Sequence, residues 1–368
     1  MATSIPIIDC HVHGSSLSGI PSLNGICECV GIERMNIVCT TGGQRVNANP
    51  AALVTKAEFP ERFYVFAGLD HSAHFSKGKL SPPSLPEQID RLMALGADGI
   101  KMIEAKPTSR KSLPIPLDGP YFEEYFTHAE ETGVPLLWHV ADPEEFWDPD
   151  KTPSWAKQRG WGYNESFVPK EQLYTEVENV LRRHPKLTVV FAHFFFLSAD
   201  LPRAAALFDR YEGTHFDLAP GIELLYNLSR DVPATRRFFE SYADRILFGT
   251  DISGGQPPEE ARLRAGIVTR WLETDEEYRV PEGADFLLGP PEDGIVRGIS
   301  LSDDALAKIY HGNFERLAGA RPKALNRELA AQECERIAAE VAVMAGTPVG
   351  DTEAAQSAVR LRRSGPPA

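Results

Sequence analysis

Eight short apolar segments recur along the chain, and stretches with helical periodicity separate most of them. Several of the segments are continuously hydrophobic, as parallel strands are when helices cover both faces of their sheet. They span 5–13, 35–41, 63–71, 98–103, 134–141, 187–195, 214–219 and 246–251. The helical stretches between them span 50–59, 85–95, 122–131, 170–183, 201–211 and 234–242. Eight strands alternating with helices predict an α/β fold, the closed (β/α)₈ TIM barrel.

The chain continues past the eighth strand with a long insertion and a helical extension. The insertion spans 253–300 and includes a helical stretch at 259–272, and a further helix is expected at 302–317. We therefore divide the chain into a barrel domain, 1–320, and a C-terminal helix and tail, 321–368, with the end frayed from Arg360 onward. The helix expected at 323–344 carries an apolar stripe of Leu325, Leu329, Ile337, Val341 and Met344. That stripe packs either on the barrel or on another subunit, which makes a homodimer possible.

Composition narrows the classes of partner. Hydrophobic residues are 42% of the 368 positions, which excludes a disordered chain, and the net charge is −14. This charge disfavours nucleic acids and anionic membrane surfaces, and no apolar run reaches the roughly 18 residues of a membrane span. Five cysteines are an odd count and no disulfide framework, and we expect no signal peptide. These features predict a cytoplasmic protein that acts on a small molecule.

Polar residues that bind metals stand where several predicted strands end. The first strand ends in Asp9-Cys10-His11-Val12-His13, and alternation places His11 and His13 on one face, with Asp9 one step deeper. Other strands end in Lys101, His139, His193 and Asp251. The carboxyl ends of barrel strands meet at the face where TIM-barrel active sites lie. Because a buried group of histidines is costly without an ion, the pattern predicts a metal site.

With these residues in place, the chain resembles the amidohydrolase superfamily, and the segment 309–317 resembles the closing helix of its amidohydrolase-related branch. The resemblance implies that His11, His13 and His139 bind the metal and that Asp251 binds it and moves a proton. It also implies that His193 either binds the metal or faces the substrate. Imidazole and carboxylate ligands suit zinc best, and manganese, iron or cobalt are possible.

Three further residues are candidate substrate contacts. The strand-four residue Lys101 is carboxylated and bridges two metals in some relatives, whereas an unmodified amine would face a substrate anion or pair with Glu104. Because the carboxylation of Lys101 is undecided, the sequence also leaves open whether the site holds one metal ion or two. His71 and Trp138 are the other candidates, because each lies near the end of a predicted strand. The aromatic loop 142–163 either forms a wall or lid over the barrel mouth or folds around a small core of its own.

The resemblance leaves two reactions open. The first is hydrolysis of an ester, lactone or amide by metal-activated water, and the second is nonoxidative decarboxylation on the same site. A decarboxylase benefits from an arginine near the metal, and no strand end carries one; Arg45, Arg110, Arg159 and Arg230 lie in loops. This favours hydrolysis. A catalytically silent binding barrel is a third alternative, but such a barrel would usually have lost a ligand, and none is missing here.

Overall fold

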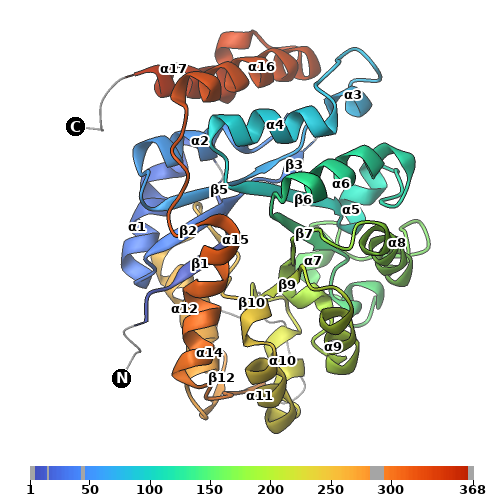
Figure 1. The fold of residues 1–368 in the computed structure, drawn as a ribbon, viewed down its shortest axis with the longest axis vertical. Helices are drawn as coiled ribbons and strands as arrows, with labels where there is room; N and C mark the ends of the chain where they lie inside the picture. The colour runs from blue at the N-terminus through green and yellow to red at the C-terminus, as the bar shows by residue number, and fades with distance from the viewer. Residues whose placement is uncertain (1–4, 15, 43–45, 282–293, 364–368) are drawn as a thin grey trace.

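The computed structural model describes residues 5–14, 16–42, 46–281 and 294–363 (Figure 1). Nine strand segments form one sheet in the order β10-β9-β8-β7-β6-β5-β2-β1-β11, and all of its pairings are parallel. They are β1 (Ile8–His13), β2 (Arg34–Val38), β5 (Phe63–Gly68), β6 (Gly99–Ala105), β7 (Leu136–Val140), β8 (Val189–Phe191), β9 (Thr214–Asp217), β10 (Ile246–Leu247) and β11 (Ile252–Ser253).

The two ends of this sheet belong to one segment of chain, so the sheet closes into a barrel. β10 pairs with β9, and β11, which begins five residues after β10 ends, pairs with β1. Between them, the amide of Cys10 donates to the carbonyl of Phe248, and the amide of Asp251 donates to that of His11, both at 2.9 Å. β10 and β11 therefore act together as the eighth strand, and the predicted (β/α)₈ fold is confirmed.

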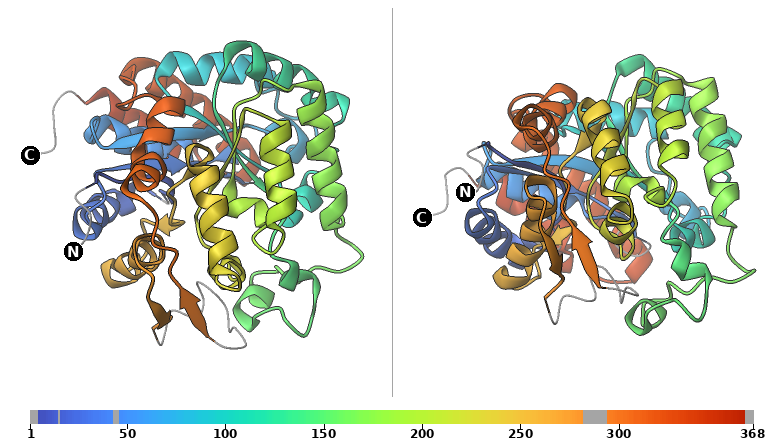
Figure 2. Two further views of the ribbon diagram at one scale, coloured as in Figure 1. Left: turned by 60° about the horizontal axis from the view of Figure 1, so that its bottom comes forward. Right: turned by 90° about the horizontal axis from the view of Figure 1, so that it is seen from below.

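Helices surround the strands (Figure 2). The main ones are α1 (Ile20–Val30), α2 (Asn49–Glu58), α4 (Leu85–Leu95), α6 (Pro120–Thr132), α8 (Lys170–Arg183), α9 (Leu201–Arg210) and α11 (Val232–Ser241). The sequence pattern predicted all of these except α1. Local signals explain the bounds: α4, for example, begins after a capping box of Ser84 and Glu87 and ends at Gly96, whose φ is +100°.

Alternation along the strands separates two apolar layers. Inside the barrel, side chains such as Tyr64, Phe66 and Leu137 form a small cluster. Phe314 of α15 (Asn313–Ala318) closes its end, with its ring centroid 4.9 Å from that of Tyr64. The neighbouring positions along the same strands point outward into the larger core under the helices. The apolar interior thus fills the barrel below the polar strand ends.

The insertion after the eighth strand is partly ordered into its own elements. α12 (Pro258–Glu273) is followed by the antiparallel pair β12 (Glu277–Arg279) and β13 (Ile295–Arg297), and residues 282–293 lie outside the described part. The helix expected at 302–317 is divided into α14 (Asp303–Ala307) and α15 by a π-helical turn, Lys308–Gly312. No helix of the described residues is long and apolar enough to cross a membrane.

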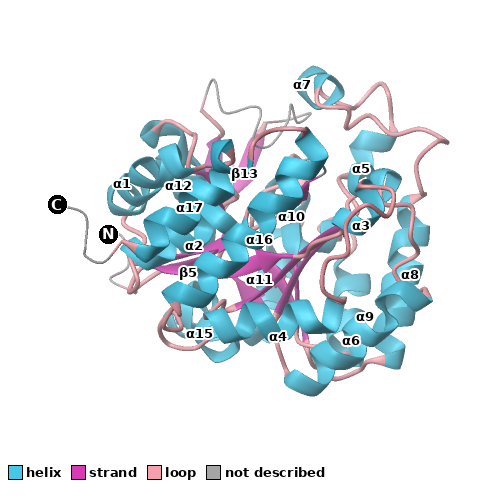
Figure 3. Ribbon diagram, turned by 90° about the horizontal axis from the view of Figure 1, so that it is seen from above, coloured by secondary structure: helices cyan, strands magenta, loops and turns pink. Residues whose placement is uncertain are grey.

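The C-terminal extension forms two helices, α16 (Arg327–Ala345) and α17 (Glu353–Arg362), which lie against each other and against α2 (Figures 1 and 3). The expected start of fraying at Arg360 is wrong, because α17 runs to Arg362; residues 364–368 lie outside the description. Most of the apolar stripe is covered within this chain: Ile337 is buried, and Val341 and Met344 pack beside it. Leu329 is the exception, with 38% exposure.

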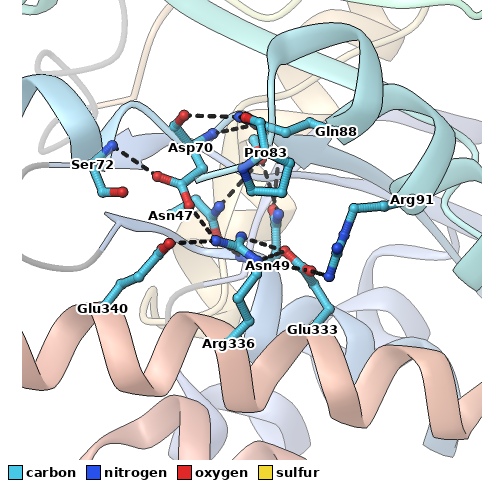
Figure 4. Close-up of polar contacts among 11 residues, drawn as sticks. Asn47, Asn49, Asp70, Ser72, Pro83, Gln88, Arg91, Glu333, Arg336 and Glu340 are labelled. Atoms are coloured by element: carbon cyan, nitrogen blue, oxygen red, sulfur yellow. Dashed lines mark hydrogen bonds and ion pairs between the residues drawn. The ribbon is translucent and has the colours of Figure 1, made fainter. Parts of the chain in front are cut away.

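A buried ion-pair cluster holds α16 on the barrel (Figure 4). Nη1 of Arg336 lies 2.7 Å from Oδ2 of Asp70, just after β5, and 2.7 Å from Oε1 of Glu340. Its other nitrogens bond Glu333. Asp70 is itself fixed, because its backbone amide donates to the side chain of Gln88 and its Oδ1 accepts from the amide of Ser72. The extension is therefore docked by charge as well as by apolar contact.

Candidate metal centre

Three of the predicted ligands meet at the carboxyl end of the barrel. His11, His13 and Asp251 each offer an atom, and these atoms lie within 4.8 Å of one another. Oδ1 of Asp251 is 3.0 Å from Nε2 of His13 and 3.8 Å from Nε2 of His11. Asp251 reaches this place from a left-handed backbone conformation, with φ +59°. Two imidazoles and one carboxylate are a donor set that fits zinc and similar divalent cations.

A bulge in β1 gives His11 its direction. Asp9 pairs with Met35, whereas Val12 pairs with Ile37, so β1 holds one residue more than β2 over this stretch. The extra residue breaks the alternation that placed Asp9 on the face of His11 and His13. Oδ1 of Asp9 instead accepts from the backbone amide of His11, and its Oδ2 accepts from the hydroxyl of Thr250. Asp9 therefore joins β1 to the eighth strand and does not contact an imidazole.

The carboxylate that orients His11 is Asp217, at the end of β9. Its Oδ2 lies 2.8 Å from Nδ1 of His11, and both side chains are buried. A carboxylate accepts, so Nδ1 carries the proton and Nε2 keeps a lone pair facing Asp251. Burial, followed by the charge of Lys101, holds the pKa of His11 well below its usual value. The sequence analysis missed Asp217, although it lies near the end of a predicted strand, as the candidate ligands do.

The carboxylate of Asp251 is charged in this setting. Burial opposes its ionisation, but the hydrogen bond from His13 and the nearby histidines hold its pKa well below its usual value. With His11 neutral and Asp251 ionised, two of the three ligands have the protonation state that metal binding requires.

His193 lies in an unusual turn directly after β8. Four successive residues, His193 to Phe196, have φ between +49° and +56°, which costs about 1–2 kcal/mol for each non-glycine residue. The turn is held because the amide of His193 donates to Asp217, the Tyr174 hydroxyl donates to the Phe195 carbonyl at 2.9 Å, and Phe195 stacks on the core. The strand expected to reach 195 therefore ends at Phe191.

The turn brings the ring of His193 to 5.1 Å from that of His11, measured between centroids. Its Nδ1 lies 2.9 Å from the carbonyl of Ala219, which can only accept, so Nδ1 is protonated and Nε2 is free. Burial lowers the pKa of His193 to about 4. His193 is thus a neutral imidazole beside the ligand group.

His139 is buried next to His193, with ring centroids 4.8 Å apart, but it is not among the three grouped ligands. Its Nε2 lies 3.0 Å from the carbonyl of Ala141 and 3.1 Å from Oδ1 of Asp142, which itself bonds Lys106. Because both contacts of Nε2 are acceptors, this nitrogen carries the proton and Nδ1 keeps the lone pair. His139 therefore lies beside the site, and the lone pair of its Nδ1 is available to bind a metal ion.

The three candidate substrate contacts all lie away from the open cavity. Lys101 is buried inside the barrel, and its Nζ has no hydrogen-bond partner among the described residues, so the expected pair with Glu104 does not form. Nε2 of His71 bonds Glu104 at 2.9 Å instead. Trp138 points outward, with its ring beside those of Phe126 and Phe191, because it alternates with the inward-facing residues of β7.

A cavity of about 770 Å³ opens over the ligand group. His13, His139, His193 and Asp251 line its floor, and the side chain of Asp251 is 32% exposed. Its volume suits a small organic molecule. The position at the carboxyl end of the strands is where TIM barrels hold their active sites.

The aromatic loop 142–163 forms one wall of this cavity and also has a core of its own. Phe146, Trp155 and Trp161 line the cavity. The same loop contributes Phe146, Ala156 and Tyr163 to a small cluster, which includes Ile222 after β9. The loop therefore forms a wall of the cavity and also folds around a small core of its own.

The cationic side chains of the cavity include only one of the loop arginines that the sequence pointed to. Of the four loop arginines, Arg159 lines the cavity, Arg110 is buried against Glu176, Arg230 lies elsewhere, and Arg45 is outside the described residues. Lys106 and Arg264 also line it, and Arg264 comes from the insertion helix α12. Chain folding, and no local motif, brings these three cations to one place.

Comparison with known proteins shows the family of this chain. A family model described as amidohydrolase matches residues 8–319. The chain belongs to the amidohydrolase family. Amidohydrolases of this family are metal-dependent enzymes, and His11, His13 and Asp251 form the group of described residues in this member that could hold the ion.

Solved structures share the fold at low identity. An amidohydrolase II has a TM-score of 0.52 and 13% identity, covering 85% of this chain and 99% of that one. An uncharacterized TIM-barrel protein from Bordetella bronchiseptica has a TM-score of 0.50 and 15% identity, with coverages of 85% and 98%. A 2,6-dihydroxybenzoate decarboxylase, solved with 2,6-dihydroxybenzoate, has a TM-score of 0.50 and 14% identity, with the same coverages. The search of curated proteins found no match.

Proposed function

We propose that this protein is a metal-dependent hydrolase of a small ester, lactone or amide. The proposal rests on the position of Asp251. Its carboxylate contacts His13 at 3.0 Å and also lines the cavity of about 770 Å³. One carboxylate thus belongs to the ligand group and faces the space for a substrate. A bound divalent cation would supply water of lowered pKa, near 7 for zinc, and would polarise a carbonyl.

The residues around the cavity have the proton states that this reaction needs. Asp251 is ionised, so its carboxylate can accept a proton from the attacking water and return it to the leaving group. His193 is neutral and keeps a free Nε2, which makes it an acceptor for a hydrogen bond from the substrate or the water. Asp217 holds His11 in place and stays away from the cavity.

Decarboxylation is the second candidate, and one observation favours it. The sequence offered no arginine near the metal ligands, but Arg264 of α12 lines the same cavity and its charge interacts with that of Asp251. A guanidinium there could hold a substrate carboxylate. Hydrolysis stays first because Asp251 and His193 supply its proton transfers without further groups.

Isotope labelling separates the two reactions. A panel of esters, lactones, amides and aromatic acids is assayed with the metal-loaded protein in ¹⁸O water, with CO₂ detection. Hydrolysis puts the label into the product without CO₂, whereas CO₂ release without label would replace this proposal with decarboxylation. The variants His11→Ala and Asp251→Asn should both abolish turnover, and His11→Ala should also lower metal content. Full activity in both variants after chelation and dialysis would contradict a metal-dependent reaction.

The identity of the ion, the homodimer and the cytoplasmic location also belong to the proposal. We infer zinc because the ligand group combines imidazole with carboxylate, although manganese, iron and cobalt accept the same donors. Elemental analysis of the purified protein distinguishes them. Five free cysteines support a reducing compartment.

A further inference from the structure

One wall of the cavity is built from cations that lie against aromatic rings. The guanidinium carbon of Arg159 lies 5.4 Å from the ring centroid of Trp155 and 5.3 Å from that of Trp161. The two rings meet edge to face, with centroids 5.9 Å apart. Nζ of Lys106 lies 4.4 Å from the Trp161 centroid. All four side chains line the same cavity.

Arg159 differs from the other cations of the cavity in having no acidic partner. Lys106 bonds Asp142 at 2.7 Å, and Arg264 lies 3.5 Å from Glu260. Among the described residues, no carboxylate lies within 4 Å of the Arg159 guanidinium. Cation–π contact with the two tryptophan rings holds the guanidinium at this wall without neutralising its charge.

The charge balance of the cavity points the same way. Its described lining carries three permanent cations and three carboxylates, which cancel: Lys106, Arg159, Arg264, Asp142, Asp251 and Glu260. A divalent ion at the ligand group would leave an excess of two positive charges, in a chain whose net charge is −14. The unbalanced positive charge on the protein side is that of Arg159, on the wall formed by the loop.

We propose that Arg159 binds an anionic group of the substrate, away from its reacting carbonyl, and that Trp155 and Trp161 contact a planar part of the same molecule. The substrate class is therefore a planar, aromatic or conjugated carbonyl compound that carries a second, anionic substituent. This rests on the proposed function, because it assumes that the reacting group lies at the metal ligands. Arg159 is then a specificity-determining residue.

Binding of unreactive probes tests this without turnover. Isophthalate and terephthalate each carry two carboxylates on one ring, and in their monoamides one carboxylate is replaced by a neutral group of the same shape. Affinities for the metal-loaded protein are measured by calorimetry and by tryptophan fluorescence. One of the dicarboxylates should bind about tenfold or more tightly than its monoamide, as expected for one charge-assisted contact.

Arg159→Gln should remove this preference, and Arg159→Lys should keep part of it, because charge remains while the planar stacking is lost. Arg237→Gln makes the same charge change at an exposed position outside the cavity lining and should leave the preference unchanged. Equal affinity for dicarboxylates and monoamides in the parent protein would overturn the proposal. So would an Arg159→Gln variant in which both affinities fall by the same factor, so that the dicarboxylate preference is unchanged, since that indicates a structural role.

The experiments distinguish a failure of the proposed anion binding by Arg159 from a failure of the proposed hydrolysis. Calorimetry reports binding of compounds that do not react, whereas the labelling assay reports the reaction. Loss of the dicarboxylate preference would leave the labelling result unaffected, and a negative labelling result would leave the role of Arg159 in binding unaffected.

Discussion

Asp217 shows how one buried residue can set the chemistry of several others. Its two oxygens serve different histidines, since Oδ2 orients the His11 ring and Oδ1 accepts from the backbone amide of His193. Burial raises the pKa of Asp217, although the hydrogen bond from the backbone amide of His193 opposes the shift. The residue is therefore a positioning group for both halves of the site.

Asp217→Asn should weaken metal binding about 10- to 100-fold, the usual effect of losing a carboxylate behind a histidine ligand. The amide keeps the shape but loses the charge that fixes the protonated Nδ1 of His11. Competition with a chelator of known affinity measures the change. Asp275→Asn is the control, because Asp275 is exposed. Unchanged metal affinity in Asp217→Asn would show that His11 needs no such support.

Lys101 gives a pH-dependent prediction. Burial lowers the pKa of this amine from 10.5 to about 8. The unfolded chain therefore binds more protons than the folded protein between pH 8 and 10.5, and stability should rise with pH across that window. Below pH 8 the buried charge is destabilising at full strength, by about 3 kcal/mol at 1.36 kcal/mol per pH unit.

Lys101→Met should therefore raise the free energy of unfolding of the metal-free protein at pH 7 by about 1–3 kcal/mol. The gain should shrink as the pH approaches 10.5. Urea unfolding at several pH values measures it, with Lys186→Met, at an exposed position, as the control. The variant should keep its metal content near that of the parent. Loss of two metals, with rescue by short carboxylic acids, would indicate a carboxylated bridging lysine instead.

At the scale of elements, the charged contacts of α16 with the barrel centre on Arg336, beside a second contact between Glu333 of α16 and Arg91 of α4 at 3.2 Å. Arg336 is 18% exposed and contacts Asp70, Glu333 and Glu340 (Figure 4). Asp70 is 1% exposed in its side chain, so it would stay buried and unpaired without Arg336. Removing one member of such a pair costs more than the pair itself contributes.

Arg336→Ala should lower the free energy of unfolding by about 3 kcal/mol, the low end of the range for buried pairs because Arg336 is partly exposed. Chemical denaturation measures this against Arg236→Ala, a change at an exposed position. A loss no larger than in the control would mean that apolar packing alone holds the helix. Because Asp70 lies outside the cavity lining, substrate affinity should change little.

For the whole molecule, the C-terminal extension acts as part of the barrel's cover. α16 contacts α2 and α4, and α17 contacts α2 and α16. Arg360 of α17 bonds Glu58 at the end of α2. Since the same chain covers most of the apolar stripe, the stripe gives no independent reason for a dimer, and the homodimer stays a prediction.

Truncation after Ala320 should cause aggregation or a changed oligomeric mass, because it uncovers the apolar faces that α16 and α17 bury. Light scattering and size-exclusion chromatography measure the outcome. A shortened protein that is monodisperse, equally stable and unchanged in oligomeric state would show that the extension is dispensable.

The sequence alone determined the barrel, because apolar strands that alternate with amphipathic helices form a local pattern that few folds can satisfy. It also indicated the three grouped candidate ligands, His11, His13 and Asp251, and the neighbouring His139 and His193, from one rule, that polar residues end the strands. It misplaced Asp9 because a bulge changes the alternation without leaving a local signal. It did not predict the left-handed turn after β8, since four residues with unfavourable φ contradict local preference.

Tertiary structure decided everything that depends on distant segments meeting. Asp217 and His11 are 206 positions apart, so no spacing motif could link them. Arg264 reaches the cavity from an insertion helix, and Arg159 from a loop whose path depends on its own small core. The apolar layers are set by short-range periodicity, whereas the charge lining of the cavity is set by contacts between elements far apart in the chain. The sequence therefore determined where the chemistry lies, and folding decided which substrate charges the site can accept.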